Sequence, residues 1–380
     1  MKLIYLDNSA TTPVDPRVFT VMKPFFSKKF GNPSEYHSLG LEARAVLENA
    51  RQKVADFLGA DSGEIIFSSG ATESINLSHK GLMENMKKAH IITTSIEHKA
   101  VLETIKHLDK KTTYLKVNKY GEIDINDLKK AITPQTALIS VMYVNNEVGT
   151  IQPIKEIGAF IKDINKSRKQ KIYFHTDATQ AVSYLDCRVK NLGVDFLSLT
   201  GHKIYAPKGV GVLYARLGTL LVRQMDGGSQ ENRMRAGTEN VPSIVGLGKA
   251  MELIDKKKTK ISFLRDKLIK GILKINGVIL TGHPAKRAPH IASFIVEGVE
   301  GEAMVLRLSS LGIIISTGSA CTSSELSASH VLTAMGYPPE ISHGSIRFSL
   351  GKDTMESDIN YVLKVFPKIV KDLRAMAPKL

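Results

Sequence analysis

Two stretches decide the fold: residues 172–180 read IYFHTDATQ, and residues 194–203 read VDFLSLTGHK. Each begins with an apolar run that predicts a buried strand, and each ends in polar residues, with Asp177 in the first and Lys203 in the second. Neighbouring strands of an open parallel sheet deliver their carboxyl ends to one crevice, where ligands bind. We therefore expect Asp177 and Lys203 to face the same crevice.

The surrounding sequence alternates strand and helix signals from about residue 40 to 215. Short apolar runs at 65–67, 91–94 and 138–144 predict further strands, and residues 153–165 have a helical pattern. Near-continuous apolar strands separated by helices indicate a sheet covered on both faces. We predict an α/β domain with a mostly parallel sheet flanked by helices.

The pattern changes after about residue 245. A long charged helix to about Ile275 is followed by strand signals at 290–296, 313–315 and 345–350, with a helix over 301–311. The last helix contains Pro367, which we expect to kink it. With 380 residues, two domains are expected. We divide the chain into a large domain (15–245) and a smaller α+β domain (1–14 and 246–380).

Composition limits the class of protein. The formal net charge is +15, and basic clusters occur at 166–171 and 256–260. We interpret these clusters as solvated helix ends or loops. The alternative is that their positive charge steers the protein electrostatically toward an acidic partner. No motif with interleaved aromatic residues suggests direct nucleic-acid binding. No stretch approaches the roughly 20 apolar residues that span a membrane, and two cysteines fit a cytoplasmic protein.

An acid and a lysine in one crevice match what pyridoxal phosphate requires. The lysine forms a Schiff base with the aldehyde, and the carboxylate keeps the ring nitrogen protonated so that the ring acts as an electron sink. Residues 69–72 (SGAT) lie between a strand and a helix, where small residues and free N–H groups bind anions. We expect Ala71, Thr72, Thr200 and His202 to hold the phosphate, although residues 69–72 alone also fit a plain turn.

Three other polar residues follow predicted strands. His98 could stack on the cofactor ring and shuttle a proton, or could be structural. Asn146 could lie near the substrate carboxylate or the ring hydroxyl, or could only form a turn. Gln180 could donate to the ring oxygen. Arg347, on the strand at 345–350, could offer a fork of donors to a substrate carboxylate or could point into water. No metal site is predicted.

The two cysteines differ in context. Cys321 lies in a run of small and hydroxyl residues, STGSACTSS, at 316–324, which predicts an exposed loop suited to a reactive thiolate. Cys187 has no such context, and we interpret it as structural.

Together these segments resemble the cysteine desulfurases of the NifS/IscS type, within the fold-type I pyridoxal phosphate enzymes. The resemblance rests on motifs that run almost from end to end: YLDNSATTP (5–13), GNPS (31–34), SGATE (69–73), EHKA (97–100), NNE (145–147), DATQ (177–180), GHK (201–203), RAGTEN (235–240), GSACTS (318–323) and RFSLG (347–351). Most members of that family have a serine where this chain has Thr200, and the threonine keeps the hydroxyl group.

The resemblance implies a role for each site residue. It makes Lys203 the Schiff-base lysine, Asp177 the partner of the ring nitrogen and His98 the residue stacked on the ring. Phosphate would be held by Thr72, Thr200 and His202, and by Thr238 from a second subunit of a homodimer. Asn146 and Arg347 would bind the carboxylate of L-cysteine.

The implied reaction converts L-cysteine to L-alanine and leaves a persulfide on Cys321. The implied partners are sulfur acceptors, either a scaffold protein of iron–sulfur cluster assembly or a tRNA-thiolation protein. An aminotransferase or a selenocysteine lyase of the same fold, and a non-catalytic sulfur-assembly scaffold or basic binding protein, remain alternatives. Cys321 argues against the aminotransferase, because that reaction needs no loop cysteine.

Overall fold

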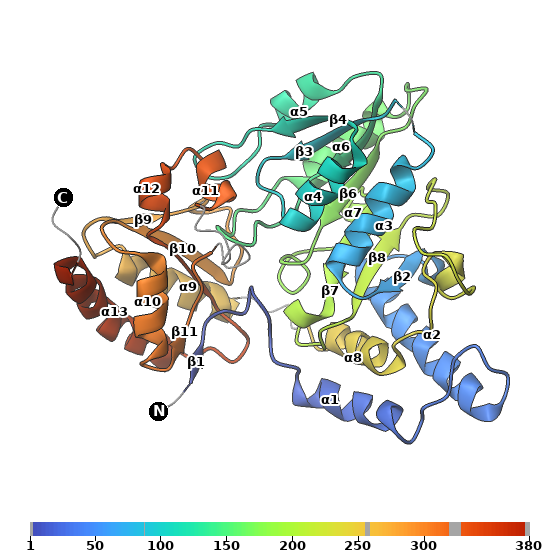
Figure 1. Cartoon of the computed structure of the whole chain (residues 1–380), viewed down its shortest axis with the longest axis horizontal. Helices are drawn as coiled ribbons and strands as arrows, with labels where there is room; N and C mark the ends of the chain where they lie inside the picture. Colours follow the sequence, from blue (N-terminus) through green and yellow to red (C-terminus); the bar gives the residue numbers. More distant parts are fainter. Residues whose placement is uncertain (1–2, 87, 255–258, 319–327, 377–380) are drawn as a thin grey trace.

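The chain folds into two domains that lie side by side (Figure 1). The computed structural model describes residues 3–86, 88–254, 259–318 and 328–376. The large domain is built on a seven-stranded sheet, and the small domain on a three-stranded sheet with a separate strand pair beside it. Most of the basic cluster at 256–260 lies outside the described residues.

The large sheet is mostly parallel, as predicted. Its strands lie in the order β2 (Ile65–Ser68), β8 (Gly211–Ala215), β7 (Phe196–Thr200), β6 (Tyr173–Asp177), β5 (Thr136–Ser140), β3 (His90–Thr94) and β4 (Lys111–Leu115). The strand β8 runs antiparallel to its neighbours β2 and β7, so β2 points the same way as the other five. The carboxyl ends of six strands therefore share one edge.

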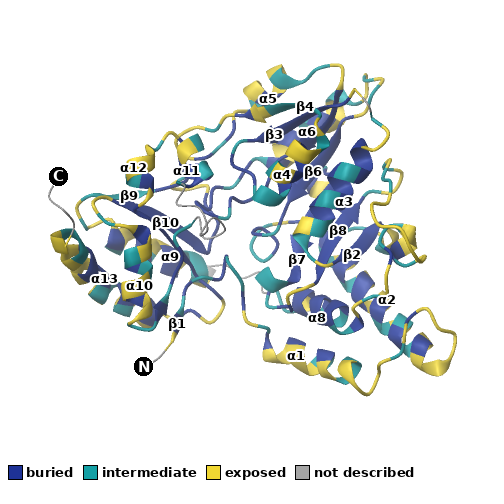
Figure 2. Ribbon diagram, in the orientation of Figure 1, coloured by how far each residue is buried: buried dark blue, intermediate teal, exposed yellow. Residues whose placement is uncertain are grey.

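Helices cover both faces of this sheet because its strand residues alternate between two cores. Phe174 and Leu197 face one core, whereas the preceding Tyr173 and Phe196 face the other. The first face carries α1 (Pro16–Met22), α2 (Ser38–Leu58), α5 (Ile125–Ala131), α6 (Ile154–Ile164), α7 (Val189–Leu192) and α8 (Val241–Glu252). The second face carries α3 (Ala71–Met83) and α4 (Lys99–Leu108). Figure 2 shows the strands buried and the outer helix surfaces exposed.

The small domain has the predicted α+β composition. Its antiparallel sheet is β9 (Val278–Leu280), β10 (Ile291–Val296) and β12 (Ser345–Ser349), and β1 (Ile4–Tyr5) pairs in parallel with β11 (Ile313–Ile314). Its helices are α9 (Thr259–Ile272), α10 (Gly301–Ser309), α11 (His330–Ala334), α12 (Pro339–Ser342) and α13 (Glu356–Met376). Pro367 lies inside α13, and the helix continues past the proline to Met376.

Short 3-10 turns join these elements. They are η1 (Lys23–Phe26), η2 (Ser62–Glu64), η3 (Gly201–Lys203) and η4 (Glu231–Arg233).

One predicted element was wrong: the long charged helix from residue 245 to Ile275 is two helices. Leu247 and Met251 of α8 pack into the large core, whereas Leu264 and Leu268 of α9 pack into the small core. One straight helix could not serve both cores. The expected boundary near residue 245 therefore falls within α8, which packs against α2. Within the described ranges, no helix is long and apolar enough to cross a bilayer.

Candidate functional site

A cavity of about 570 Å³ opens where the carboxyl ends of the parallel strands meet the small domain. Its wall combines segments that follow β2, β3, β5, β6 and β7 with Arg347 from β12 and with residues 9–11. The cavity brings together ten of the residues selected from the sequence: Ala71, Thr72, His98, Asn146, Asp177, Gln180, Thr200, His202, Lys203 and Arg347.

Two residues that the sequence predicts for the site are not among the described residues that line this cavity. Cys321 lies outside the described residues, but Gly318 lines the cavity. Thr238 is exposed and is not among the lining residues of its own chain. Cys187 is buried in the large core, as its structural interpretation expected.

Lys203 follows β7 in the turn η3 and points toward the N-terminal segment. Its ammonium donates to the carbonyl oxygens of Ser9 and Ala10. Ser9 O also accepts a hydrogen bond from Gln180 Nε2 at 3.0 Å. These two carbonyls had no predicted role, because a backbone carbonyl leaves no signature in the residue type.

Asp177 ends β6 and is nearly buried, with its Oδ1 accepting from the Thr179 N–H at 2.9 Å. His98 is the N-cap of α4, and its Nδ1 accepts from the Ala100 N–H at 3.1 Å. Burial lowers the pKa of His98, opposed in part by the charge of Asp177. The neutral ring therefore carries its proton on Nε2, because the cap occupies the lone pair of Nδ1.

The start of α3 is a candidate cradle for an anion. The first N–H groups of a helix have no acceptor within the helix and carry positive partial charge. Gly70, just before α3, packs against Gly211, the first residue of β8. A Cβ atom added to Gly211 would lie only 2.5 Å from Gly70 Cα, so a side chain does not fit there. Thr200, His202 and Lys208 line the same cavity, and Lys208 was not selected from the sequence.

Arg347 enters the cavity from the small domain and is 3% exposed. Its Nη2 forms an ion pair with Asp7 Oδ1 at 2.9 Å, and its Nη1 donates to the Asn146 carbonyl at 2.8 Å. Its Nε is buried without a hydrogen-bond partner among the described residues. The structure thus places Arg347 in a cleft rather than in water, and one donor is left for a ligand.

Two buried carboxyl groups stand behind the cavity. Glu97 Oε1 accepts from Thr94 Oγ1 and Met142 N, and burial raises the pKa of Glu97 to about 8. Burial also raises the pKa of Glu147, whose Oε2 accepts from Ser329 Oγ. Both lie within sequence motifs already noted, but nothing in the motifs shows that they are enclosed.

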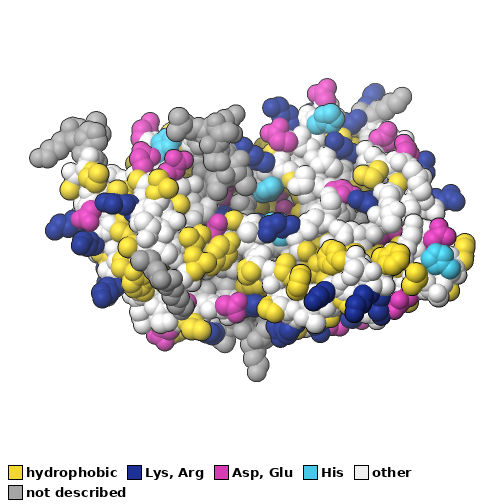
Figure 3. All heavy atoms as spheres, turned by 60° about the horizontal axis from the view of Figure 1, so that its bottom comes forward, with side chains coloured by type: hydrophobic (Ala, Val, Ile, Leu, Met, Phe, Trp, Pro, Cys, Tyr) yellow, Lys and Arg dark blue, Asp and Glu magenta, His cyan; other side chains and the backbone are white. Residues whose placement is uncertain are grey.

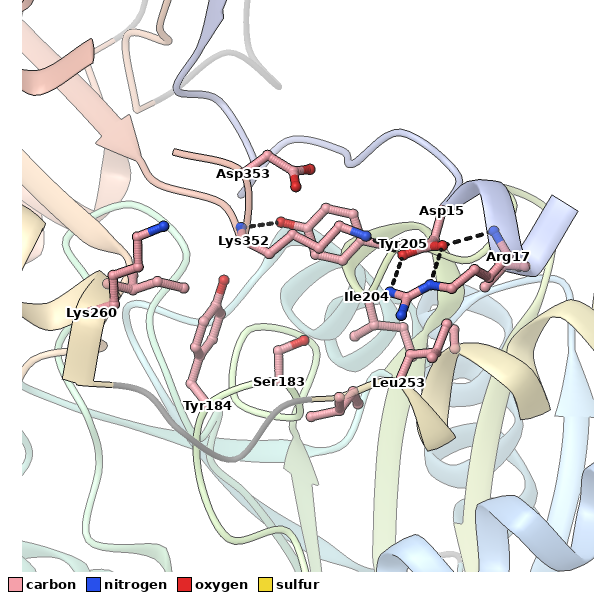
Figure 4. Close-up of a pocket in the computed structure, with 14 residues that line it drawn as sticks. Asp15, Arg17, Ser183, Tyr184, Ile204, Tyr205, Leu253, Lys260, Lys352 and Asp353 are labelled. Carbon is pink, nitrogen blue, oxygen red and sulfur yellow. Dashed lines mark hydrogen bonds and ion pairs between the residues drawn. The ribbon is translucent and has the colours of Figure 1, made fainter. Parts of the chain in front are cut away.

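A second cavity, of about 640 Å³, lies between the domains on the side of α1 (Figure 4). Figure 4 shows Asp15 held between Arg17 and Lys352, and Tyr184 and Lys260 across the cavity from them. The acids and bases here largely pair with one another. We therefore assign the chemistry to the smaller cavity, where a lysine, an acid, a histidine and an anion cradle converge.

The surface also has a distinctive face. Figure 3 turns the lower side of Figure 1 toward the reader. On this face, apolar side chains form a band, and lysines and arginines lie beside it. The helix α1 lies on that side, and its Phe19 is 55% exposed.

Comparison with known proteins gives consistent results. Residues 4–362 match the model of the aminotransferase class-V family. The chain is 49% identical to the cysteine desulfurase IscS of Methanosarcina thermophila, over 99% of this chain and 94% of the relative.

Solved structures agree. A NifS-like protein superposes with a TM-score of 0.91 at 38% identity, covering 98% of this chain and 100% of that one. A structure described as SspA in complex with cysteine has a TM-score of 0.80 at 37% identity, covering 91% of this chain and 98% of that one.

Proposed function

The chain belongs to the class-V aminotransferase family and, within it, to the cysteine desulfurases, and from that premise we propose that it removes sulfur from L-cysteine with bound pyridoxal phosphate. The products are L-alanine and a persulfide on Cys321. The observation that carries the proposal is the convergence of Lys203, Asp177, His98 and Arg347 on one cavity next to Gly318.

The residues around the cavity fit the cofactor. A volume of about 570 Å³ lies in the range of small-molecule sites. The anion cradle at α3 suits a phosphate, and the close approach of Gly70 and Gly211 leaves no room for a side chain between them. The buried Arg347 Nε has no partner among the described residues, so it is a donor left for a carboxylate.

When bound, pyridoxal phosphate supplies an electron sink that stabilises negative charge at the substrate. Lys203 would hold its aldehyde carbon, Asp177 its ring nitrogen, and Ala71, Thr72, Thr200 and His202 its phosphate. The carboxylate of Asp177 favours a protonated ring nitrogen because opposite charges close together stabilise one another. The amine of Lys203 would take up the proton from Cα of cysteine.

The role of His98 is limited to stacking on the ring and donating a hydrogen bond. Because Nδ1 accepts from the Ala100 N–H, Nε2 is the ring nitrogen that can donate to a ligand in the cavity. It can stack on a ring and donate from Nε2, but accepting a proton at Nδ1 would break the helix cap. We therefore assign proton abstraction to Lys203 and a donor role to His98.

Arg347 and Asn146 would bind the substrate carboxylate. The guanidinium is fixed by Asp7 and by the Asn146 carbonyl, so it is oriented before substrate arrives. The solved relative named SspA was determined with cysteine, which supports cysteine as the substrate of this cavity.

Cys321 would take the sulfur. Its thiolate attacks the sulfur of cysteine, and an S–S bond forms as the Cβ–S bond breaks. The electron pair of the broken bond remains on the β carbon, which takes up a proton to give alanine. A thiol near its free pKa of about 8.5 is mostly protonated at neutral pH, so deprotonation of Cys321 must accompany the attack.

Partners follow from the same proposal. The persulfide is passed to an acceptor protein of iron–sulfur cluster assembly or of tRNA thiolation, in a cytoplasm reducing enough to keep the thiol active. The active protein is a homodimer in which Thr238 of one subunit reaches the phosphate held by the other. The exposed position of Thr238 and the apolar band in Figure 3 support an association surface.

The test supplies the purified protein with pyridoxal phosphate, L-cysteine and a thiol reductant. We expect equal amounts of alanine and sulfide. Cys321→Ser should keep the visible absorption band of the cofactor and release no sulfide, whereas the matched control Cys187→Ser should remain active.

Other outcomes would support the alternatives. A keto acid without sulfide would identify an aminotransferase, and a faster reaction with selenocysteine would identify a selenocysteine lyase. Absence of a visible band would leave a binding protein.

A further inference from the structure

His290 lies at the junction of the two domains, just before β10, and is 2% exposed. Its Nε2 is 3.2 Å from Gln180 Oε1. Its Nδ1 is buried and has no hydrogen-bond partner among the described residues. Burial, together with the charges of Arg347, Arg265 and Lys203, lowers the pKa of His290 to about 3.

The neighbours of Gln180 define which way its amide points. Gln180 Nε2 donates to Ser9 O at 3.0 Å, so Oε1 is the atom that faces His290. An amide oxygen accepts only, and therefore His290 must carry its proton on Nε2. If the amide were reversed, its oxygen would face the carbonyl oxygen of Ser9, and these two acceptors would have no proton between them.

The amide nitrogen of Gln180 has a second hydrogen. One hydrogen is used by Ser9 O, and Gln180 lines the cavity that contains Lys203. The second hydrogen is therefore left for an acceptor in that cavity. Because Ser9 O also accepts from Lys203, the amide shares its anchor with the central amine.

The imidazole ring is held in its plane by Tyr184. The two rings stack, with centroids 4.1 Å apart and an angle of 15° between their planes. Tyr184 lines the second cavity (Figure 4), whereas His290 is not among the described residues that line it. Tyr184 thus covers the ring on one side, and Gln180 accepts from its edge.

A histidine whose Nδ1 is buried without a partner is an unfavourable choice for filling space, since an apolar ring would leave no polar atom unsatisfied. A histidine at this position is explained if its Nε2–H is needed as a hydrogen-bond donor to Gln180. We propose that His290 is a positioning residue, which fixes the amide of Gln180 so that its NH₂ group faces Ser9 and donates to an oxygen atom of the ligand in the cavity. The identity of that ligand as pyridoxal phosphate rests on the proposed function.

The experiment is a double-mutant cycle with His290→Phe and Gln180→Leu. Phenylalanine keeps a ring against Tyr184 and removes the donor. Each single variant should shift the maximum or the pH midpoint of the visible band of the bound cofactor, and each should weaken cofactor binding about tenfold, the equivalent of one hydrogen bond. The double variant should be no worse than either single variant, because both remove the same interaction.

Controls separate positioning from general damage. His107→Phe, an exposed histidine on α4, should leave the band unchanged. His290→Gln, whose amide can still donate, should restore the band and most of the affinity. If His290→Phe does not fold, Gln180→Leu keeps the test decisive, because an unchanged band and affinity in that variant would mean that the amide does not reach the ligand.

Either of two results would overturn the inference: an unshifted band in His290→Phe, or effects of His290→Phe and Gln180→Leu that simply add. If the wild-type protein binds no cofactor, the proposed function fails first, and the role of His290 fails with it.

Discussion

Glu97 is the residue whose protonation depends most clearly on the fold. Its Oε2 is buried without a partner among the described residues, and the nearby charge of Asp177 adds to the effect of burial on its pKa. The folded-state pKa is about 8, against 4.5 for the free side chain. The folded chain therefore binds more protons than the unfolded chain between these two values, and the free energy of unfolding must fall as the pH rises through this window.

Glu97→Gln should remove this dependence. One pKa unit corresponds to about 1.4 kcal/mol, and we expect the wild-type free energy of unfolding to fall by at least that amount between pH 5 and pH 8 because of Glu97. Urea unfolding at pH 5, 6.5 and 8 measures the difference between variant and wild type. Glu103→Gln, on the exposed side of α4, is the matched control. Equal pH slopes for Glu97→Gln and wild type would show that Glu97 ionises normally in the fold.

In the proposed function, recognition of the substrate depends on Arg347. Arg347→Lys keeps the charge but loses the fork that binds both Asp7 and the Asn146 carbonyl. We expect KM for cysteine to rise about tenfold or more, as for other truncated charge-assisted contacts. Steady-state kinetics measure the effect, with the exposed Arg307→Lys as control. An unchanged KM would remove Arg347 from the substrate site.

Among the elements, the contact between the start of α3 and β8 supports the proposed phosphate cradle. A methyl group on Gly211 would lie within 3 Å of Gly70 Cα, Gly70 C and Leu199 O, all backbone atoms that cannot turn aside. Gly211→Ala should therefore displace the cradle and weaken cofactor binding at least tenfold, with a loss of stability of about 1–3 kcal/mol, the usual cost of overpacking.

Gly63→Ala is the control for Gly211→Ala, because nothing lies within 4 Å of the added methyl. Equilibrium dialysis with pyridoxal phosphate and thermal unfolding provide the two measurements. Normal cofactor affinity in Gly211→Ala would place the phosphate elsewhere.

The same elements show what the sequence could predict. The apolar runs before Asp177 and Lys203 identified β6 and β7, and their shared direction placed both side chains in one cavity. The antiparallel direction of β8 could not be predicted from the sequence, because an apolar run has the same pattern whichever way the strand points. The long helix predicted after residue 245 failed because its apolar residues serve two separate cores.

Long-range contacts were the other limit. Gln180 and His290 are 110 residues apart, and no periodicity links them. The carbonyls of Ser9 and Ala10 contact Lys203 through backbone atoms, which any residue type would provide.

At the scale of the whole molecule, the N-terminal segment connects the two domains at the cavity. Asp7 pairs with Arg347 of the small domain, and Ser9 O accepts from Lys203 of the large domain. The Ser9 N–H donates to Ser349 Oγ at 2.8 Å, and Asn8 Nδ2 donates to Ser349 O at 2.9 Å. The separation between Arg347 and Lys203 thus depends on one short segment attached to both.

The proposed shared active site makes a prediction about mixed dimers. If Thr238 serves the other subunit, neither Lys203→Ala nor Thr238→Ala homodimers have a complete site. In a mixed dimer, the Thr238→Ala chain keeps its own Lys203 and receives an intact threonine from the Lys203→Ala chain, which restores one site of two. Random reassortment of equal amounts gives half mixed dimers, and so about a quarter of wild-type activity at limiting cofactor.

The two variants are unfolded together, refolded and assayed for alanine, and each is also refolded alone. Refolded mixtures with no more activity than the separate variants would mean that Thr238 acts within its own chain or not at all. Activity above either parent, in a species whose mass is that of two chains, would support a threonine supplied across the interface, because no arrangement within a single chain combines an intact Lys203 with an intact Thr238 in this mixture.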